Sequence, residues 1–277
     1  MSTKYPAVPD LSGQVAVVTG GGRGIGRACA VALAAAGASV AIVARTEEEL
    51  EATSKATGGG AVVFPADVTD LAAMRQVAET VRTQLGPVDL LVNNAGMGTP
   101  IGPVAEVDPY AWWRCVEVNL RGPMLCSRLL LPEMLARGKG RIINVASGAG
   151  TAGIANLSAY VASKAALIQF SECLANEVRA AGIRVFAVQP GTVRTAMAEE
   201  ALESEAGRKW LPWFQEYFKE RRDVPPEVAA RLVLFLAAGR GDALSGRFID
   251  ACTDYAALVQ EAALVQQDDR LVMRYRA

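Results

Sequence analysis

The sequence predicts an α/β fold in which one domain is built on a doubly wound, mostly parallel sheet of about seven strands. Short runs rich in Val, Ile and Ala alternate with longer helical segments, and such runs are typical of strands that are buried on both faces. No linker-like stretch interrupts the 277 residues. The predicted strands are residues 15–19, 39–43, 61–64, 88–93, 141–146, 184–189 and 247–250.

Composition excludes several classes of function. Hydrophobic residues make up 51% of the chain and the formal net charge is -1, which supplies a large core but no basic surface for nucleic acid. The chain has no histidine, so a Ser-His-Asp triad within one chain is excluded and the commonest transition-metal ligand is missing. The five cysteines are scattered without C-x-x-C spacing, and we expect no metal site.

Neither a signal peptide nor a membrane span is expected. Residues 1–10 contain no apolar segment of the kind that signal peptides require, which predicts a cytoplasmic protein. Residues 28–44 carry no charge, but they are Ala-rich, and Gly37 divides them into a helix and a strand.

The first strand, 15–19, is followed directly by a glycine-rich turn and a predicted helix over 27–36. Glycines permit a tight turn and let the backbone approach a pyrophosphate, while the helix N-terminus offers N–H groups to it. A nucleoside-triphosphatase loop is excluded because Arg27 and Ala28 stand where Lys and Ser/Thr are needed. The predicted phosphate-binding residues are Gly20, Gly22, Arg23, Gly24, Ile25 and Gly26.

The end of the second strand predicts the cofactor. Ala44 stands where NAD-binding proteins place a carboxylate on the ribose 2′-hydroxyl. Ala44 leaves space for a 2′-phosphate, Arg45 can donate two hydrogen bonds to it, and Arg23 adds a second positive charge. We therefore expect NADP as the preferred cofactor, with NAD as the alternative if both arginines are solvated loop residues.

The fifth strand leads to the candidate catalytic residues. Ser147 follows residues 141–146, at the strand end where ligands of such sheets bind, and its hydroxyl can hold a carbonyl oxygen. Tyr160 and Lys164 are four residues apart in a predicted helix over 158–180, so both lie on one face. Because a cation beside a phenol favours the phenolate, we expect Lys164 and a positively charged oxidised nicotinamide to lower the pKa of Tyr160, which would then act as general acid/base.

These motifs together resemble the short-chain dehydrogenase/reductase family. The resemblance rests on Thr19-Gly20-x-x-x-Gly24-x-Gly26, on Asn93-Asn94-Ala95-Gly96, on Ser147 with Tyr160-x-x-x-Lys164, and on Pro190-Gly191. It covers roughly residues 10–250. It implies a Rossmann-like fold and a nicotinamide-dependent enzyme that interconverts a secondary alcohol and a ketone, both small molecules, with Tyr160 as the acid/base.

The resemblance also implies roles for residues that the motifs alone leave open. Asn119 would join Lys164 in a water-linked proton relay, whereas a purely local hydrogen-bonding role is the alternative. Asp67 and Val68 would contact adenine, with a helix N-cap as the competing interpretation. The remaining cofactor contacts implied by the family are Asn94, Ala95 and Gly96 on the adenosine side, and Pro190, Gly191, Val193 and Thr195 near the nicotinamide amide and pyrophosphate.

Two segments depart from the family or leave the substrate open. Gly246 to Ala251 lacks the usual Gly-Gly pair, and the non-standard tail, about 251–277, is expected to form a small helix over 254–265 that covers the site or reaches another subunit. The segment 194–224 corresponds to the family's substrate lid. It carries aromatic residues at helical spacing, which indicate core or interface packing more often than a ligand surface: Trp210, Trp213, Phe214, Tyr217 and Phe218.

The expected quaternary state is a homodimer or homotetramer. The family resemblance implies it, and the predicted helices 109–135 and 158–180 carry apolar residues on more than one face. Two other functions stay open, a reductase of an activated C=C or C=N bond on the same scaffold and a non-catalytic dinucleotide-sensing protein. The joint presence of Ser147, Tyr160 and Lys164 favours the enzyme.

Overall fold

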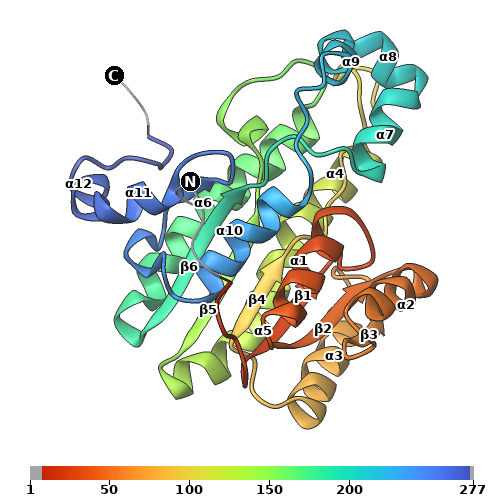
Figure 1. The fold of residues 1–277 in the computed structure, drawn as a ribbon. Helices are drawn as coiled ribbons and strands as arrows, with labels where there is room; N and C mark the ends of the chain where they lie inside the picture. The colour runs from red at the N-terminus through yellow and green to blue at the C-terminus, as the bar shows by residue number, and fades with distance from the viewer. Residues whose placement is uncertain (1–7, 275–277) are drawn as a thin grey trace.

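Seven parallel strands form the central sheet of the computed structural model, which describes residues 8–274 (Figure 1). Their spatial order is β3-β2-β1-β4-β5-β6-β7, so the order reverses between β1 and β4 and ligands are expected beyond the carboxyl ends there. The predicted sheet and fold class are confirmed. The strands are β1 (Val15–Thr19), β2 (Ser39–Ala44), β3 (Val62–Pro65), β4 (Leu90–Asn93), β5 (Gly140–Val145), β6 (Ile183–Gln189) and β7 (Phe248–Asp250).

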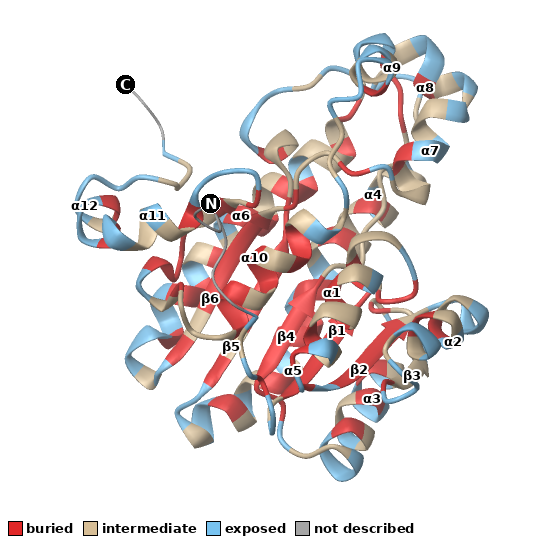
Figure 2. Ribbon diagram, in the orientation of Figure 1, coloured by how far each residue is buried: buried red, intermediate tan, exposed pale blue. Residues whose placement is uncertain are grey.

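Helices cover both faces of the sheet, because successive side chains of a strand point to opposite faces. Val18 belongs to the apolar core on one face and Val17 to the core on the other. The central strands are accordingly buried along most of their length, as Figure 2 shows, whereas the edge strands β3 and β7 are only partly buried. The helices of the first face are α1 (Gly24–Ala35), α2 (Glu47–Ala56) and α10 (Glu227–Ala237), and those of the second are α3 (Leu71–Gln84), α5 (Gly122–Arg137) and α6 (Ser158–Val178).

Two predicted helices have different boundaries in the structure. Helix α1 begins at Gly24 rather than at residue 27, so the end of the glycine-rich turn forms its first turn. The predicted helix 109–135 is divided into α4 (Pro109–Val116), a π-helical turn (Glu117–Arg121) and α5. Asn119 lies in that π-helical turn. The periodicity of the apolar residues does not predict such a turn.

The segment after β6 lies above the carboxyl ends of the strands (Figure 1). It contains three short helices, α7 (Ala196–Glu203), α8 (Glu205–Trp210) and α9 (Pro212–Lys219). Ser204 separates the first two by capping α8, since its hydroxyl accepts a hydrogen bond from the Gly207 N–H at 3.0 Å.

The tail packs on the sheet edge rather than on the carboxyl ends of the strands. It forms two short helices, α11 (Tyr255–Gln260) and α12 (Ala262–Gln267), where one helix was expected. Tyr255 is buried against Phe235 of α10, with ring centroids 5.0 Å apart. The N–H of Phe248, on the outer edge of β7, donates to the Leu271 carbonyl at 2.8 Å.

Parts of two predicted segments lie outside the described residues, namely 1–7 of the amino-terminal stretch and 275–277 of the tail. Within residues 8–274, none of the helices is long and apolar enough to cross a membrane. The uncharged stretch 28–44 forms most of α1 and all of β2.

Candidate active site

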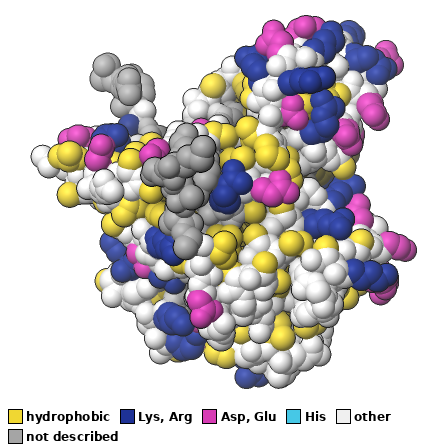
Figure 3. All heavy atoms as spheres, viewed as in Figure 1, with side chains coloured by type: hydrophobic (Ala, Val, Ile, Leu, Met, Phe, Trp, Pro, Cys, Tyr) yellow, Lys and Arg dark blue, Asp and Glu magenta, His cyan; other side chains and the backbone are white. Residues whose placement is uncertain are grey.

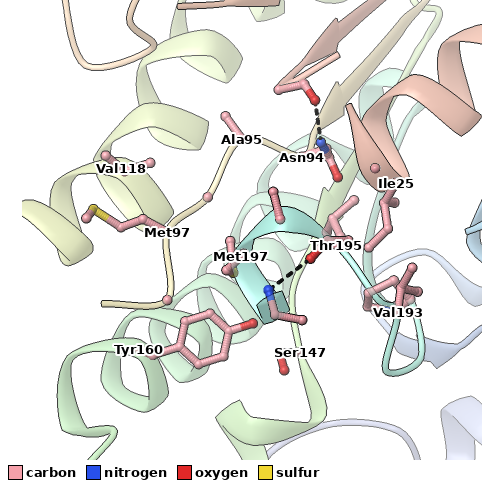
Figure 4. Close-up of a pocket in the computed structure, with 18 of the residues that line it drawn as sticks. Ile25, Asn94, Ala95, Met97, Val118, Ser147, Tyr160, Val193, Thr195 and Met197 are labelled. Atoms are coloured by element: carbon pink, nitrogen blue, oxygen red, sulfur yellow. Dashed lines mark hydrogen bonds between the residues drawn. The ribbon is translucent and has the colours of Figure 1, made fainter. Parts of the chain in front are cut away.

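A cavity of about 610 Å³ opens at the carboxyl ends of the strands. The glycine-rich turn, the ends of β2, β4, β5 and β6, and one face of α6 line it, and α7 and α9 close it from above. Figure 4 shows several of the lining side chains. The predicted site residues that line it are Gly20, Gly22, Arg23, Gly24, Ile25, Arg45, Asp67, Val68, Asn94, Ala95, Gly96, Ser147, Tyr160, Lys164, Pro190, Gly191, Val193 and Thr195.

The glycine-rich turn fits a pyrophosphate. Gly20 and Gly24 have φ angles of 63° and 54°, in the left-handed region that favours glycine. Helix α1 starts from an extended Arg23 whose side chain makes no capping hydrogen bond, so within the described chain the first N–H groups of α1 are left for an anion.

Gly26 was predicted to contact the cofactor, but it does not line the cavity. It lies behind the turn, where a Cβ atom would be 2.1 Å from the Gly20 carbonyl oxygen and 2.4 Å from Nδ2 of Asn94. Glycine at this position therefore allows α1 to pack against the turn instead of touching a ligand.

Asn94 joins the ends of β1 and β4. Its Nδ2 donates to the carbonyl oxygens of Thr19 and Gly20, each at 3.1 Å. The Thr19 hydroxyl accepts in turn from the N–H groups of Asn94 and Ala95, at 3.1 and 3.2 Å. The Asn94 side chain thus holds the glycine-rich turn in place.

An acidic residue that the sequence analysis did not single out lies at the adenosine end. Glu49 of α2 lines the cavity, and its Oε1 is 3.0 Å from Nη1 of Arg23. Helix α2 is tied to the turn by Thr53, whose hydroxyl donates to the Gly22 carbonyl at 2.9 Å. Arg23 is therefore ion-paired, although it was expected to be a cation available to a 2′-phosphate.

Asp67 is held by a second unpredicted residue, Arg114 of α4, which also lines the cavity. Arg114 is paired with Asp67 and donates to the Thr69 hydroxyl at 2.7 Å. Burial would raise the pKa of Asp67, but hydrogen bonds from Thr69 and the Arg114 cation outweigh it and hold that pKa below its usual value. The competing N-cap interpretation is wrong for Asp67, because Asp70 caps α3.

The candidate catalytic residues converge on one wall. Tyr160 and Ser147 both turn their hydroxyls into the cavity in Figure 4. The Ser147 hydroxyl accepts from the Ala149 N–H at 3.2 Å. Lys164 is 5% exposed, its Nζ donates to the Val145 carbonyl at 2.8 Å, and it lies 5.8 Å from the centroid of the Tyr160 ring.

The pKa values of these residues differ from the expectation. Desolvation raises the pKa of Tyr160, and a hydrogen bond with Ser147 opposes it in part. Desolvation also lowers the pKa of Lys164 to about 8. Burial therefore disfavours the charged forms of both groups, and Lys164 alone does not produce the expected lowering of the Tyr160 pKa.

Asn119 lies behind the cavity wall rather than in it. Its Oδ1 accepts from the Met97 N–H at 2.9 Å, and its Nδ2 donates to the Met97 carbonyl and to the Ser163 hydroxyl, both at 2.9 Å. A Cβ atom at Gly96 would be 3.1 Å from Asn119 Oδ1 and 3.7 Å from Lys164 Nζ. Asn119 and Lys164 therefore face the same narrow space beside Gly96.

The segment after β6 lines the cavity as well, through Thr195. Thr195 caps α7, since its hydroxyl accepts from the Ala198 N–H at 3.3 Å, as the dashed line in Figure 4 marks. A Cβ atom at Gly24 would be 3.1 Å from Cγ2 of Thr195. Thr195 therefore lies directly over the N-terminus of α1.

The aromatic residues of 194–224 divide between the two roles considered. Trp213, Phe214 and Tyr217 line the cavity. Phe218 is buried under the Arg194 guanidinium, and Trp210 packs beside the apolar cluster of Ile101, Leu157 and Leu211. Packing alone does not account for this stripe.

Within residues 8–274, no group of three or more His, Cys, Asp or Glu side chains is placed to hold a metal ion.

Comparison with known proteins identifies similar sequences and folds. A family model described as short chain dehydrogenase matches residues 14–206. A short chain dehydrogenase of Pseudocercospora fijiensis is 36% identical, with 95% of this chain and 89% of that protein covered. Galactitol 2-dehydrogenase of Rhizobium johnstonii is 38% identical over 87% of this chain and 94% of its own length. The crystal structure of levodione reductase superimposes with a TM-score of 0.79 at 30% identity, covering 86% of this chain and 96% of that one.

Proposed function

The chain belongs to the short-chain dehydrogenase/reductase family, and we propose that it interconverts a secondary alcohol and a ketone with a nicotinamide cofactor, preferably NADP. The observation that carries the proposal is the convergence of Ser147, Tyr160 and Lys164 on the cavity that the glycine-rich turn also lines. One relative is named a galactitol 2-dehydrogenase and one structural neighbour a levodione reductase. The first name indicates oxidation of an alcohol and the second indicates reduction of a ketone, which supports the proposed pair of functional groups.

The dinucleotide would be held along the length of the cavity. The N–H groups at the start of α1 suit its pyrophosphate, Asp67 and Val68 suit adenine, and Asn94 to Gly96 shape the wall between them. Residues Pro190 to Thr195 would border the nicotinamide end. When bound, the reduced cofactor supplies a hydride to the carbonyl carbon of the substrate, and the oxidised cofactor takes one from the alcohol.

The protein would supply the proton and the positioning. The Ser147 hydroxyl donates to the carbonyl oxygen and polarises it. The Tyr160 hydroxyl gives its proton to the same oxygen in ketone reduction and takes it back in alcohol oxidation. The raised pKa of Tyr160 suits a proton donor. We propose that Lys164 and Asn119, which both face Gly96, return a proton to it from solvent.

The proposed NADP preference rests on Ala44 and Arg45 at the end of β2, which both line the cavity. Position 44 carries no carboxylate that would repel a 2′-phosphate, and Arg45 can bind one. Glu49 works against it by neutralising part of the charge on Arg23. Arg45 is therefore assigned the main contact with a 2′-phosphate.

The test is to follow nicotinamide absorbance with NADPH and with NADH against a panel of ketones and alcohols. Turnover of at least one carbonyl compound, faster with NADPH, supports the proposal. Binding of both cofactors without turnover of any compound in the panel would favour a dinucleotide-sensing role instead.

We extend the same proposal to assembly as a homodimer or homotetramer in the cytoplasm. On α4, Tyr110 is 85% exposed and Trp113 is 63% exposed, which is unusual for large aromatic residues of a lone subunit. Sedimentation of the protein at micromolar concentration tests this, and a stable monomer contradicts it.

A further inference from the structure

Charge is distributed unevenly along the cavity. Among the lining residues in the described part of the chain, the charged side chains are Arg23, Arg45, Glu49, Asp67, Arg114 and Lys164. The first five surround the adenosine end, and Lys164 is engaged at the Val145 carbonyl. Beyond Ser147 and Tyr160, none of the described residues that line the space under α7 and α9 is a cation, since the Arg222 guanidinium stacks on the Tyr217 ring but does not line the cavity.

The wall of that space is apolar and aromatic, and we call it the substrate chamber. Its lining side chains come from the loop after β4, from the loop before α6 and from α7 to α9: Met97, Ile101, Ile154, Leu157, Met197, Ala201, Leu211, Trp213, Phe214 and Tyr217. Trp213 and Phe214 meet edge to face, with centroids 5.4 Å apart and planes at 71°. Such a corner offers one ring face and one ring edge to a flat guest.

Two polar side-chain groups near the chamber already have partners. The Tyr217 hydroxyl donates to the Arg222 carbonyl at 2.9 Å, so Tyr217 presents its ring and not its hydroxyl. Nε2 of Gln189 donates to Oδ2 of Asp250 at 3.1 Å. A guest with several hydroxyl groups would lose its hydrogen bonds to water here and find few replacements.

The chamber is formed by contacts that do not depend on a ligand. The Gly102 N–H donates to the Asn156 carbonyl at 2.8 Å, which joins the loop after β4 to the loop before α6. Ile101, Leu157 and Leu211 are buried together, which fixes both loops to the start of α9. The charged residues of α8 and α9 lie on the outer surface instead, where Figure 3 shows mixed Lys/Arg and Asp/Glu side chains.

From these contacts we infer that the substrate chamber selects a neutral, ring-containing ketone, or the corresponding alcohol, whose ring packs into the corner of Trp213 and Phe214. The inference rests on the proposed function and names its substrate class. Acyclic polyols, carboxylates, phosphates and their esters are disfavoured, because burying them without partners costs several kcal/mol.

The experiment separates binding from turnover. The Tyr160→Phe protein, saturated with NADPH, is titrated with para-methylacetophenone, with para-acetylbenzoate of nearly the same shape, and with dihydroxyacetone as an acyclic polyhydroxy ketone. Binding is measured by calorimetry. We expect para-methylacetophenone to bind at least about ten-fold more tightly than either of the others, a difference of about 1.4 kcal/mol. Equal or tighter binding of para-acetylbenzoate or dihydroxyacetone would overturn the inference.

A second arm tests the aromatic corner. Trp213→Ala, added to Tyr160→Phe, should weaken para-methylacetophenone about ten-fold, whereas Trp113→Ala on the exposed face of α4 should leave its affinity unchanged. Because Trp213 is 46% exposed, we expect the fold to tolerate its loss. An unchanged affinity in the Trp213 variant contradicts the assignment of that corner. If the ketone binds as expected but wild-type protein oxidises neither NADPH nor NADH with it, the proposed activity fails while the ligand class stands.

Discussion

Arg23 of the glycine-rich turn and Glu49 of α2 form an ion pair at the adenosine end of the cavity, with Nη1 and Oε1 3.0 Å apart. Both residues line the cavity, so the pair places one negative charge close to the expected position of a 2′-phosphate. We therefore expect the carboxylate to weaken the NADP preference that we propose for Arg45.

Replacing that carboxylate should tighten NADPH binding. In Glu49→Gln, loss of the negative charge leaves Arg23 available to the phosphate, and since both side chains are partly exposed we expect a gain of about 0.5–1 kcal/mol, or roughly two- to five-fold in Kd. NADH affinity should change little. Fluorescence titration with both cofactors checks this, with Glu51→Gln on the same helix as the control. An equal effect on NADH would show that Glu49 does not act on the 2′-phosphate.

The cofactor preference should reverse when the end of β2 is rebuilt. Ala44→Asp/Arg45→Ala adds a carboxylate that repels the phosphate and removes its main cation. We expect kcat/KM for NADPH to fall by at least about a hundred-fold, while that for NADH is kept or raised. Steady-state kinetics with one ketone measures both. A wild-type preference for NADH, or no shift in the double variant, would contradict the assignment.

Tyr160→Phe should abolish turnover and retain cofactor binding. The change removes the transferable proton but little of the surface that a dinucleotide contacts. Activity should fall by at least about a thousand-fold, and the Kd for NADPH should stay within about three-fold of wild type. Kinetics and fluorescence titration check the two parts separately. A kcat near that of wild type would assign the proton to another group.

Lys164 should make stability depend on pH in a predictable direction. Its pKa is lowered from 10.5 in the unfolded chain to about 8 in the folded protein. Between these values the unfolded chain binds more protons, so this residue's contribution to the free energy of unfolding rises as pH rises. The penalty for burying its charge is greatest below about pH 8 and disappears above the unfolded value.

The measurement is urea unfolding of wild type and Lys164→Met at pH 7 and pH 9.5. From the two pKa values, wild type should gain about 2 kcal/mol relative to the variant over this interval. The difference between the proteins cancels the contributions of the buried Cys29 and Cys126 thiols, whose raised pKa values act in the opposite direction. A constant difference between wild type and variant at the two pH values would mean that Lys164 titrates normally.

The tail should stabilise the sheet through Tyr255. Its ring is 4% exposed and packs on Phe235, so Tyr255→Ala leaves a cavity between the tail and α10. We expect a loss of about 3 kcal/mol in the free energy of unfolding. Tyr110→Ala is the matched control, because Tyr110 is 85% exposed and its loss should cost less than about 0.5 kcal/mol in a single subunit. Equal effects of the two substitutions would show that Tyr255 of the tail does not contribute to the hydrophobic core.

The sequence predicts the sheet well because the central strands are buried on both faces and so carry continuous apolar runs, as in residues 15–19. Local spacing likewise predicts that Tyr160 and Lys164 share a face of α6. Both signals depend on neighbours along the chain. They are therefore visible without a structure.

Other parts of the site depend on contacts between residues that are distant in the sequence, and these could not be predicted from local patterns. Glu49 reaches the glycine-rich turn only because α2 packs on it, and Arg114 reaches Asp67 across the carboxyl ends of the strands. The raised pKa of Tyr160 results from burial, which spacing does not reveal. Gly26 matched the family motif, yet its role is to admit the Gly20 carbonyl at a distance that no Cβ atom allows.

The hydrogen bond from the Phe248 N–H to the Leu271 carbonyl has a consequence for aggregation of the protein. It covers part of the outer edge of β7, and an uncovered strand edge pairs readily with strands of other chains. A molecule whose tail has come away from β7 would expose that edge, so the tail protects the sheet from adding a neighbouring molecule.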